Sequence, residues 1–258
     1  MRVAVCGATG AVGTIMLDVL RRRGFPADEV VPFATERSEG RTLEHADAPV
    51  RVMREDTIEG FDLALFSAGG STSREWAPRF AAAGAVVVDN SSAWRMHDDV
   101  PLVVTEVNAD ALASHRGIVA NPNCTTMVAM LPLKALHDAF GLTALVATSY
   151  QAAGGAGQKG IDELAAQVPV LHADVGALVN DGDRARRKVE SSVHADTLAY
   201  NVVPMLGTLG EEGYTDEELK LQNESRKILS IPGLPVSPTC VRVPVMVGHG
   251  VAIRAVFA

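Results

Sequence analysis

Short, mainly apolar runs alternate with helical patterns along the first half of the chain. Runs of strand length lie at 2–6, 30–34, 62–66, 85–88, 102–104 and 118–120. Helical patterns occupy 12–23, a segment that ends near 83, and 124 to about 140. Continuous apolar strands between helices are typical of a parallel sheet that is covered on both faces. The first half is therefore predicted to be an α/β domain.

The pattern changes after Gly141, where longer strands are predicted at 142–147, 236–245 and 250–257. A helix is predicted from Thr215 to about Leu229, because Thr215 and Glu218 have the spacing of a capping box. Pro132 should kink the helix that begins at Cys124. These elements predict a second, α+β domain with a mixed sheet, and we place the domains at 1–127 and 128–258. The charge cluster at 181–188 predicts a solvated loop.

The first predicted strand ends in a glycine-rich turn that leads into a helix. Gly7, Gly10 and Gly13 stand at the spacing of a dinucleotide-binding turn in a Rossmann-like domain. Such glycines let the backbone approach a pyrophosphate, whose charge the helix N-terminus favours. A glycine turn alone is also a common tight turn, but its place at the first strand–helix connection favours nucleotide binding.

The end of the second predicted strand bears on the choice between NAD and NADP. An acidic residue at this place binds the ribose 2′-hydroxyl, whereas a basic residue accepts a 2′-phosphate. The chain has Thr35-Glu36-Arg37-Ser38, which supports both interpretations.

A cysteine stands at the start of the helix that follows the last strand of the first half. Cys124 comes directly after Asn121-Pro122-Asn123, and Asn is favoured where helices start. The partial positive charge of a first helical turn should push the thiol toward the nucleophilic thiolate. Free N–H groups of the same turn could stabilise an oxyanion. The alternative is a buried, inert cysteine at a strand–helix corner.

Composition narrows the classes of function. The 258 residues are 47% hydrophobic, which is enough for one large or two small cores. The formal net charge of −8 argues against nucleic acid or an anionic membrane as a general partner. Three cysteines without C-x-x-C spacing predict neither a disulfide framework nor a zinc site, and suit the reducing cytoplasm. The chain should have no signal peptide, and no apolar run reaches the ~18 residues of a membrane span.

Several motifs in one order resemble the aspartate-β-semialdehyde dehydrogenase family. The nucleophile segment is Asn121-Pro122-Asn123-Cys124-Thr125-Thr126. The other segments are Gly7 to Gly13, Phe66 to Gly69, Asp89 to Arg95, Ser149 to Ala152, Glu217 to Lys220, and Cys240 to Pro244. Each motif alone is weak, but together they cover nearly the whole chain and are specific.

The resemblance implies NADP-dependent reduction of aspartyl-β-phosphate to aspartate-β-semialdehyde and phosphate. This reaction belongs to the biosynthesis of lysine (through diaminopimelate), threonine and methionine. Cys124 would form a thioester, Gln151 would orient the acyl group, and His249 would be the general acid–base. Arg242 would bind the α-carboxylate and Glu217 the α-ammonium. The phosphate ligands would be Lys220, Arg95 and Asn123. The alternatives are an exposed i,i+3 ion pair for Glu217 and Lys220, and cation–π packing on Trp94 for Arg95.

The resemblance also implies a set of cofactor residues and a homodimer. The cofactor residues would be Gly7, Thr9, Gly10, Ala11, Val12, Gly13, Arg37, Ser38, Ser67, Asn90, Gly154 and Gly155. Arg37 and Ser38 match positions that hold the 2′-phosphate, which favours NADP. The family often has Ser where this chain has Gly154, so only backbone contacts are expected there.

The family's chains continue beyond the position of Ala258, and the continuation supplies the rest of a sheet and a returning helix. We therefore expect a shortened chain that is marginally stable or self-associating and turns over poorly. One alternative function is an N-acetylglutamyl-phosphate reductase, whose substrate has no α-ammonium for Glu217. Another is a non-catalytic remnant that binds a dinucleotide or a partner chain.

Overall fold

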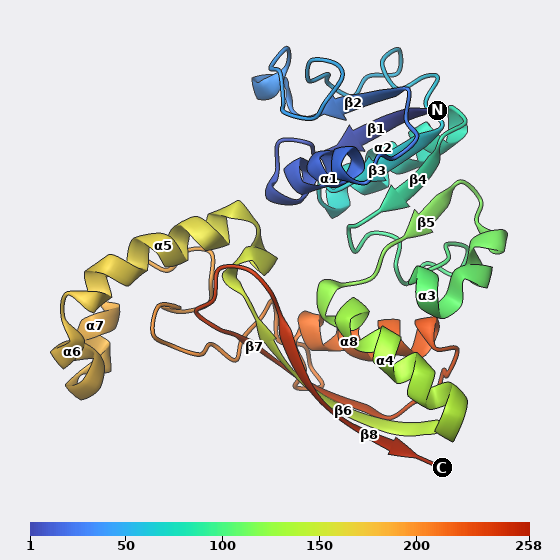
Figure 1. Ribbon diagram of the computed structural model, residues 1–258. Coiled ribbons are helices and arrows are strands. Elements are labelled where there is room, and N and C mark those ends of the chain that lie inside the picture. The colour runs from blue at the N-terminus through green and yellow to red at the C-terminus, as the bar shows by residue number, and fades with distance from the viewer. The chain divides into compact units, whose positions relative to one another are not determined.

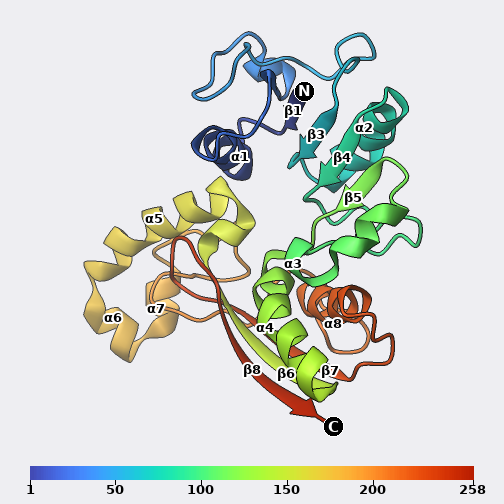
Figure 2. The ribbon, with the colours of Figure 1, turned by 45° about the vertical axis from the view of Figure 1, so that its right-hand side comes forward.

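The computed structural model describes residues 1–258, which form two compact units, Met1–Asn123 and Cys124–Ala258. Figures 1 and 2 show the elements of each unit. The division falls four residues before the boundary expected at Met127. The reason is that the whole helix from Cys124 packs on elements of the second unit.

The first unit contains one parallel sheet of five strands in the order β2-β1-β3-β4-β5. The strands are β1 (Arg2–Cys6), β2 (Glu29–Phe33), β3 (Leu63–Phe66), β4 (Val86–Asp89) and β5 (Ile118–Ala120). The helices are α1 (Ala11–Arg22), α2 (Gly70–Ala82) and α3 (Thr105–Asn108), with 3-10 turns η1 (Glu36–Ser38) and η2 (Ala109–Ser114). The prediction of a Rossmann-like α/β domain is confirmed. The strand expected at 102–104 is reduced to a single bridge between Leu102 and Ala120.

Apolar side chains of the strands form the core of the first unit. Val3 and Val5 of β1 are fully buried and pack with Leu17 of α1. On β2 and β3, Phe33 and Phe66 each meet the ring of Phe80 of α2 edge-to-face, at centroid distances of 5.8 and 5.4 Å. Each large apolar side chain buried in this way contributes roughly 1.5–3 kcal/mol. The core fixes the strand ends, and with them the loops that follow.

The second unit has a mixed sheet, as predicted, and its three strands follow the order β7-β6-β8. β6 (Leu142–Gln151) runs parallel to β7 (Val236–Arg242) and antiparallel to β8 (Gly250–Phe257). Helices α4 (Cys124–Phe140) and α8 (Asp216–Ile228) pack on this sheet. Pro132 lies inside α4 without ending it. The capping box of Thr215 and Glu218 begins α8, as expected.

Helix α8 also covers the free edge of β7 with polar side chains. Glu218 accepts from the N–H of Cys240 at 3.0 Å, and Gln222 donates to the carbonyl of Val236 at 3.0 Å. Arg226, one further turn along, donates to the carbonyl of Leu234 at 2.8 Å. The three side chains are four residues apart, so they share one face of the helix. They replace the missing neighbouring strand and satisfy edge groups that would otherwise be open to pairing.

The segment from 153 to 203 forms a small helical lobe with its own apolar core. It contains the turn η3 (Ala153–Ala156) and helices α5 (Gln158–His172), α6 (Val175–Asn180) and α7 (Gly182–Arg186). The loop expected at 181–188 is therefore wrong, because most of that segment is helix, but its charged side chains are exposed as expected. Asp174 caps α6 and forms ion pairs with Arg184 and Lys188, which stabilise the charged segment locally. None of the helices in the chain has both the length and the apolar content that crossing a bilayer needs.

Candidate active site

The glycine turn after β1 is shaped by two very close backbone approaches. Gly7 has φ +87°, and a Cβ there would lie 2.3 Å from the carbonyl oxygen of Ser67. At Gly13 a Cβ would lie 2.1 Å from the carbonyl oxygen of Gly7. Helix α1 then starts at Ala11 without a side-chain cap. Its first N–H groups are thus available to an anion, as in dinucleotide-binding turns.

A pocket of about 750 Å³ opens beside this turn. Of the predicted cofactor residues, Gly7, Thr9, Gly10, Arg37 and Ser67 line it. Glu36, the other charged candidate, lines it as well. Sequence reasoning missed the remaining walls, which are Ala34, Thr35, Val52, Met53, Ala68, Thr72 and Trp76. Trp76 carries a visible signal, since it is one of only two tryptophans in the chain.

Several predicted residues of the first unit do not line the pocket. Ser38 is 4% exposed at the end of η1, and Ala11, Val12 and Gly13 lie in the first turn of α1. The side chain of Asn90 accepts from that of Asn121 at 2.8 Å. Arg95 and Asn123 are buried. Arg95 donates to the carbonyls of Asn121 and Asn90, both at 2.9 Å, so these contacts tie together the ends of β4 and β5.

In the second unit, Cys124 is exposed as the first residue of α4. Its thiol was expected to approach a thiolate, but the structure gives the opposite direction. Desolvation by surrounding protein atoms and the carboxylate of Glu217 raise the pKa of Cys124. Hydrogen bonds from the Thr125 hydroxyl and from N–H groups of the first helical turn lower it, but by less. The unliganded protein therefore holds Cys124 as a thiol.

Gln151 connects the start of α4 with α8. It ends β6, is 1% exposed, and is the register partner of Arg242 at the end of β7. Its Nε2 lies 2.6 Å from the hydroxyl of Thr125, 3.2 Å from that of Ser149 and 3.2 Å from Oε1 of Glu217. The two N–H bonds of the Gln151 amide thus face three acceptor oxygens. These contacts fix the amide beside Thr125, the residue that follows Cys124.

The first turn of α8 carries a cluster of opposite charges. Lys220 Nζ lies 3.0 Å from a carboxylate oxygen of Glu217 and 3.0 Å from one of Asp216. Burial lowers the pKa of Lys220, but the two carboxylates outweigh it and leave the pKa raised. Asp216 also accepts from the N–H of Thr208 at 2.7 Å. Asp216 was not predicted; its position four residues before Lys220 was the available signal.

Arg242 and His249 meet the main chain of Ala152. Arg242 Nη1 donates to the Ala152 carbonyl at 2.8 Å, and the Ala152 N–H donates to His249 Nδ1 at 3.1 Å. Gly155 lies against both side chains, because a Cβ there would be 2.6 Å from Arg242 Nη1 and 3.2 Å from His249 Nε2. Gly154 donates its N–H to the carbonyl of Met246 at 3.0 Å. In the second unit Gln151 contacts Glu217, which pairs with Lys220, and Ala152 and Gly155 contact both Arg242 and His249.

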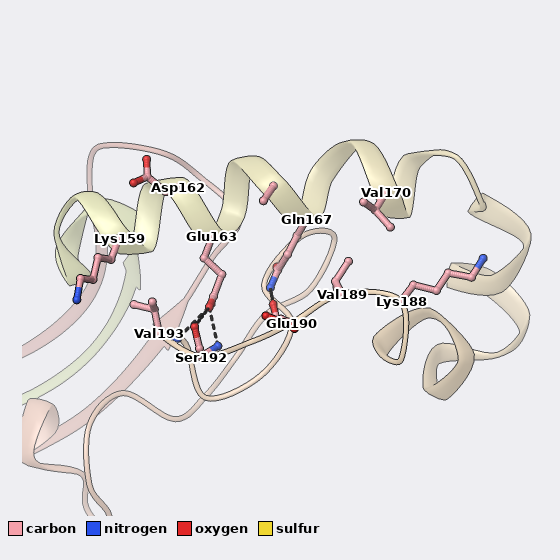
Figure 3. Close-up of a pocket in the computed structure, with 11 residues that line it drawn as sticks. Lys159, Asp162, Glu163, Gln167, Val170, Lys188, Val189, Glu190, Ser192 and Val193 are labelled. Carbon is pink, nitrogen blue, oxygen red and sulfur yellow. Dashed lines mark hydrogen bonds between the residues drawn. The ribbon is translucent and has the colours of Figure 1, made fainter.

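Two further pockets lie in the second unit. One, of about 420 Å³, is walled by residues 192–195 and 203–208 and by Arg242. The other, of about 510 Å³, contains no predicted site residue and lies between α5 and residues 188–193 (Figure 3). Figure 3 shows Glu163 and Gln167 of α5 reaching across to this segment.

The fold and these groups of residues define a class of protein, a nucleotide-dependent enzyme with a cysteine among amide, carboxylate and guanidinium groups. Two family descriptions match the chain. "Semialdehyde dehydrogenase, NAD binding domain" matches residues 2–115, and "Semialdehyde dehydrogenase, dimerisation domain" matches residues 133–258.

Individual relatives agree with these descriptions. The chain is 51% identical to the aspartate-semialdehyde dehydrogenase of Corynebacterium glutamicum, over 99% of this chain and 76% of that protein. It is 51% identical to the one of Streptomyces akiyoshiensis, over 100% of this chain and 76% of the relative. The structure of aspartate semialdehyde dehydrogenase II from Vibrio cholerae, complexed with ASA, has a TM-score of 0.86 at 42% identity. The match spans 98% of this chain and 73% of the Vibrio cholerae chain. The chain belongs to the aspartate-semialdehyde dehydrogenase family of oxidoreductases.

Proposed function

We propose that the chain catalyses the NADPH-dependent reduction of aspartyl-β-phosphate to aspartate-β-semialdehyde and phosphate. The observation that carries this proposal is the arrangement around Cys124. Cys124 begins α4 and is followed by Thr125, whose hydroxyl bonds to Gln151 Nε2. The carboxylate of Glu217 raises the pKa of the Cys124 thiol. Arg242, the register partner of Gln151, supplies the opposite charge that an amino-acid substrate needs. The names of the relatives support the substrate.

The proposed reaction has two steps. The sulfur of Cys124 bonds to the acyl carbon, the bond from that carbon to the phosphate oxygen breaks, and the thiol proton leaves with the phosphate. A thioester divides a difficult displacement into two easier steps. When bound, NADPH supplies the hydride that reduces the thioester carbonyl. The carbon–sulfur bond then breaks, the aldehyde leaves, and the sulfur takes up a proton.

The residues around Cys124 have separate tasks in these steps. Main-chain N–H groups near Asn123 and Cys124 stabilise the developing oxyanion. Gln151 holds the acyl group, and His249 exchanges protons with the reacting oxygen.

The two charged ends of the substrate require opposite partners. The α-carboxylate pairs with Arg242, whose planar fork binds two oxygens, and the α-ammonium pairs with Glu217. The phosphate pairs with Lys220, Arg95 and Asn123.

NADP is the proposed cofactor, and its support is Arg37 on the wall of the nucleotide pocket. Gly7, Thr9, Gly10, Ala11, Val12 and Gly13 would hold the pyrophosphate, and Ser38, Ser67, Asn90, Gly154 and Gly155 would complete the contacts with the cofactor. Arg37→Ala should weaken NADP binding much more than NAD binding. A preference of the unmutated protein for NAD would instead assign the ribose contact to Glu36.

The proposed setting is the cytoplasm, where the enzyme serves the synthesis of lysine, threonine and methionine. The three free cysteines suit a reducing compartment. We propose a homodimer, supported by the dimerisation-domain match and by the exposed apolar sheet face of Val146, Tyr150 and Val256.

The test is an NADP(H) absorbance assay with aspartate-β-semialdehyde and phosphate. Cys124→Ser should abolish turnover and leave NADP binding largely intact. More than a few per cent of residual activity in this variant would show that Cys124 is not the nucleophile. No turnover by the unmutated protein would overturn the proposed function.

A further inference from the structure

The amide of Gln151 is oriented by the carboxylate beside it. Its nitrogen lies 3.2 Å from Oε1 of Glu217, and an ionised carboxylate can only accept a hydrogen bond. Turning the amide over would place two acceptor oxygens against each other. The same nitrogen lies 2.6 Å from the hydroxyl oxygen of Thr125. The Gln151 amide is therefore the donor to this hydroxyl.

The hydroxyl of Thr125 accepts from Gln151 and still has its own hydrogen to donate. Thr125 is 1% exposed, so the surrounding protein must supply the acceptor. A hydrogen bond joins this hydroxyl to the sulfur of Cys124, the preceding residue, and it lowers the pKa of the thiol. Only a donor has this effect, because it stabilises the thiolate. The hydrogen of Thr125 therefore points to the sulfur.

Two charged side chains from other elements also act on the sulfur. The carboxylate of Glu217, from α8, repels the thiolate, and the guanidinium of Arg242, from β7, attracts it. Both charges would be paired by the two charged ends of the proposed substrate. The Thr125 hydroxyl is different, because it belongs to the same helical turn as Cys124 and its partner Gln151 is 1% exposed. Its hydrogen bond to the sulfur does not depend on the substrate.

We propose that Thr125 is a positioning residue whose hydroxyl, oriented by the Gln151 amide, donates its hydrogen to the sulfur of Cys124. In the proposed reaction the sulfur carries negative charge twice, when it attacks the acyl carbon and when the carbon–sulfur bond of the thioester breaks. One donor stabilises the sulfur at both moments. The role in turnover rests on the proposed function, whereas the hydrogen bond does not.

Alkylation of the unliganded protein tests the hydrogen bond. Thr125→Val keeps the branched shape without the donor, and Gln151 keeps Ser149 and Glu217 as acceptors for its two N–H bonds. The thiolate fraction should fall by about tenfold or more, but the remaining thiolate is more nucleophilic. Alkylation of Cys124 by iodoacetamide at pH 8 should therefore be roughly three- to tenfold slower.

Thr125→Ser keeps the hydroxyl and should restore most of the alkylation rate. Mass spectrometry of the peptides separates Cys124 from the two buried cysteines, and melting curves show that each variant is folded. An unchanged rate in Thr125→Val, or a Thr125→Ser variant that is equally slow, would overturn the proposal.

A double-mutant cycle tests whether Gln151 acts through Thr125. Gln151→Leu should slow alkylation in the parent and slow it less in Thr125→Val, where the hydroxyl is already absent. Equal slowing in both proteins, or none in the parent, would show that Gln151 does not orient the hydroxyl. Ser149→Ala is the matched control. It removes a second hydroxyl that accepts from Gln151, but that hydroxyl bonds to the thiol of Cys240, so the rate at Cys124 should not change.

Turnover tests the role in the reaction. We expect kcat of Thr125→Val to be lower than that of Thr125→Ser by on the order of tenfold, the effect of one hydrogen bond to a charged group. NADP affinity should be equal in both. Equal kcat values would refute the role in turnover. Absence of turnover in the unmutated protein would refute the proposed function, and the alkylation rates would still decide the hydrogen bond.

Discussion

At the scale of single residues, the unexpected feature is the protonated thiol of Cys124. The helix start supplies the hydrogen bonds that the sequence predicts, but desolvation and the charge of Glu217 outweigh them. A substrate ammonium paired with Glu217 would cancel that charge. The site would then activate its thiol when the amino-acid end of the substrate is bound.

This account predicts the pH dependence of Cys124 alkylation. The rate follows the thiolate fraction, so it should rise with pH through a pKa above the ordinary value of 9.0. Glu217→Gln removes the repulsive charge and should shift this profile to lower pH, giving faster alkylation at pH 8. Glu106→Gln, in α3 of the other unit, is the matched control. A profile that is the same in Glu217→Gln and in the control would show that Glu217 does not act on the thiol.

Asp216 gives a second prediction at this scale. It competes for the ammonium of Lys220, a proposed phosphate ligand, at 3.0 Å. Asp216→Asn removes the charge and keeps an oxygen for the N–H of Thr208. Because a partly exposed ion pair is worth about 0.2–1 kcal/mol, KM for phosphate should fall by roughly 1.5- to 5-fold, and KM for the semialdehyde should not change.

The control for Asp216 is Asp138→Asn, which breaks a similar i,i+4 pair with Lys134 on α4. Its kinetics should match those of the unmutated protein. If KM for phosphate stays constant or rises in Asp216→Asn, then Asp216 does not restrain Lys220.

At the scale of elements, apolar runs predicted β1 and β2 well, because both strands are buried within the sheet. The run at 102–104 is equally buried but forms only one bridge, so burial alone does not decide a strand. The capping box of α8 was also predictable, since it depends on two residues three positions apart. Helix α7 was not, because its charged segment is stabilised by Asp174, ten residues before Arg184. The wall residues Val52 and Met53 join the nucleotide pocket only through the tertiary fold. The hydrogen bond from Ala152 to His249 uses the main-chain N–H of Ala152, so the type of residue 152 does not predict it.

The helical lobe provides a prediction about acid. Glu163 of α5 accepts from the N–H groups of Ser192, Val193 and His194 at 2.6, 2.8 and 3.0 Å (Figure 3). Burial raises the pKa of Glu163, but these bonds outweigh it and leave the pKa lowered. Because the pKa of Glu163 is lowered in the folded state, its carboxylate stabilises the lobe at pH values above the unfolded-state pKa of about 4.3. That contribution is lost as the pH falls through this value toward the lower pKa of the folded state.

Hydrogen exchange at residues 190–199 measures this effect. Protection, corrected for the intrinsic rates, should fall in the unmutated protein as the pH drops from 6 through about 4.3 and below. Glu163→Gln should lower protection by about 1–3 kcal/mol at pH 6, because an amide cannot accept all of these bonds, and should remove the pH dependence. Asp162→Asn, an exposed neighbour on α5, should behave like the parent. If protection does not depend on pH, Glu163 is not what holds the segment.

At the scale of the whole molecule, the open question is what covers the sheet of the second unit. Helices α4 and α8 pack on one face, toward which Gln151 points. The opposite face presents Val146 and Tyr150 of β6, each 47% exposed, and Val256 of β8, 42% exposed. Val256 is next to these residues because it pairs with Ala144 in the antiparallel register. An apolar face of this kind is a site for association.

The homodimer proposal therefore predicts the effect of a charge in the middle of that face. Val146→Glu places a carboxylate where an interface of about 1,600 Å² would exclude water. It should raise the dimer dissociation constant by at least about a hundredfold, which corresponds to roughly 2.7 kcal/mol. Folding should change little, because Val146 is already half exposed in the single chain.

Val179→Glu on α6, where Val179 is 75% exposed, is the matched control. Light scattering over a dilution series, with melting curves for all three proteins, makes the comparison. The expected result is a folded Val146→Glu monomer at concentrations where the parent and Val179→Glu remain dimers. A Val146→Glu protein that stays dimeric to the same dilution would place the interface on another surface.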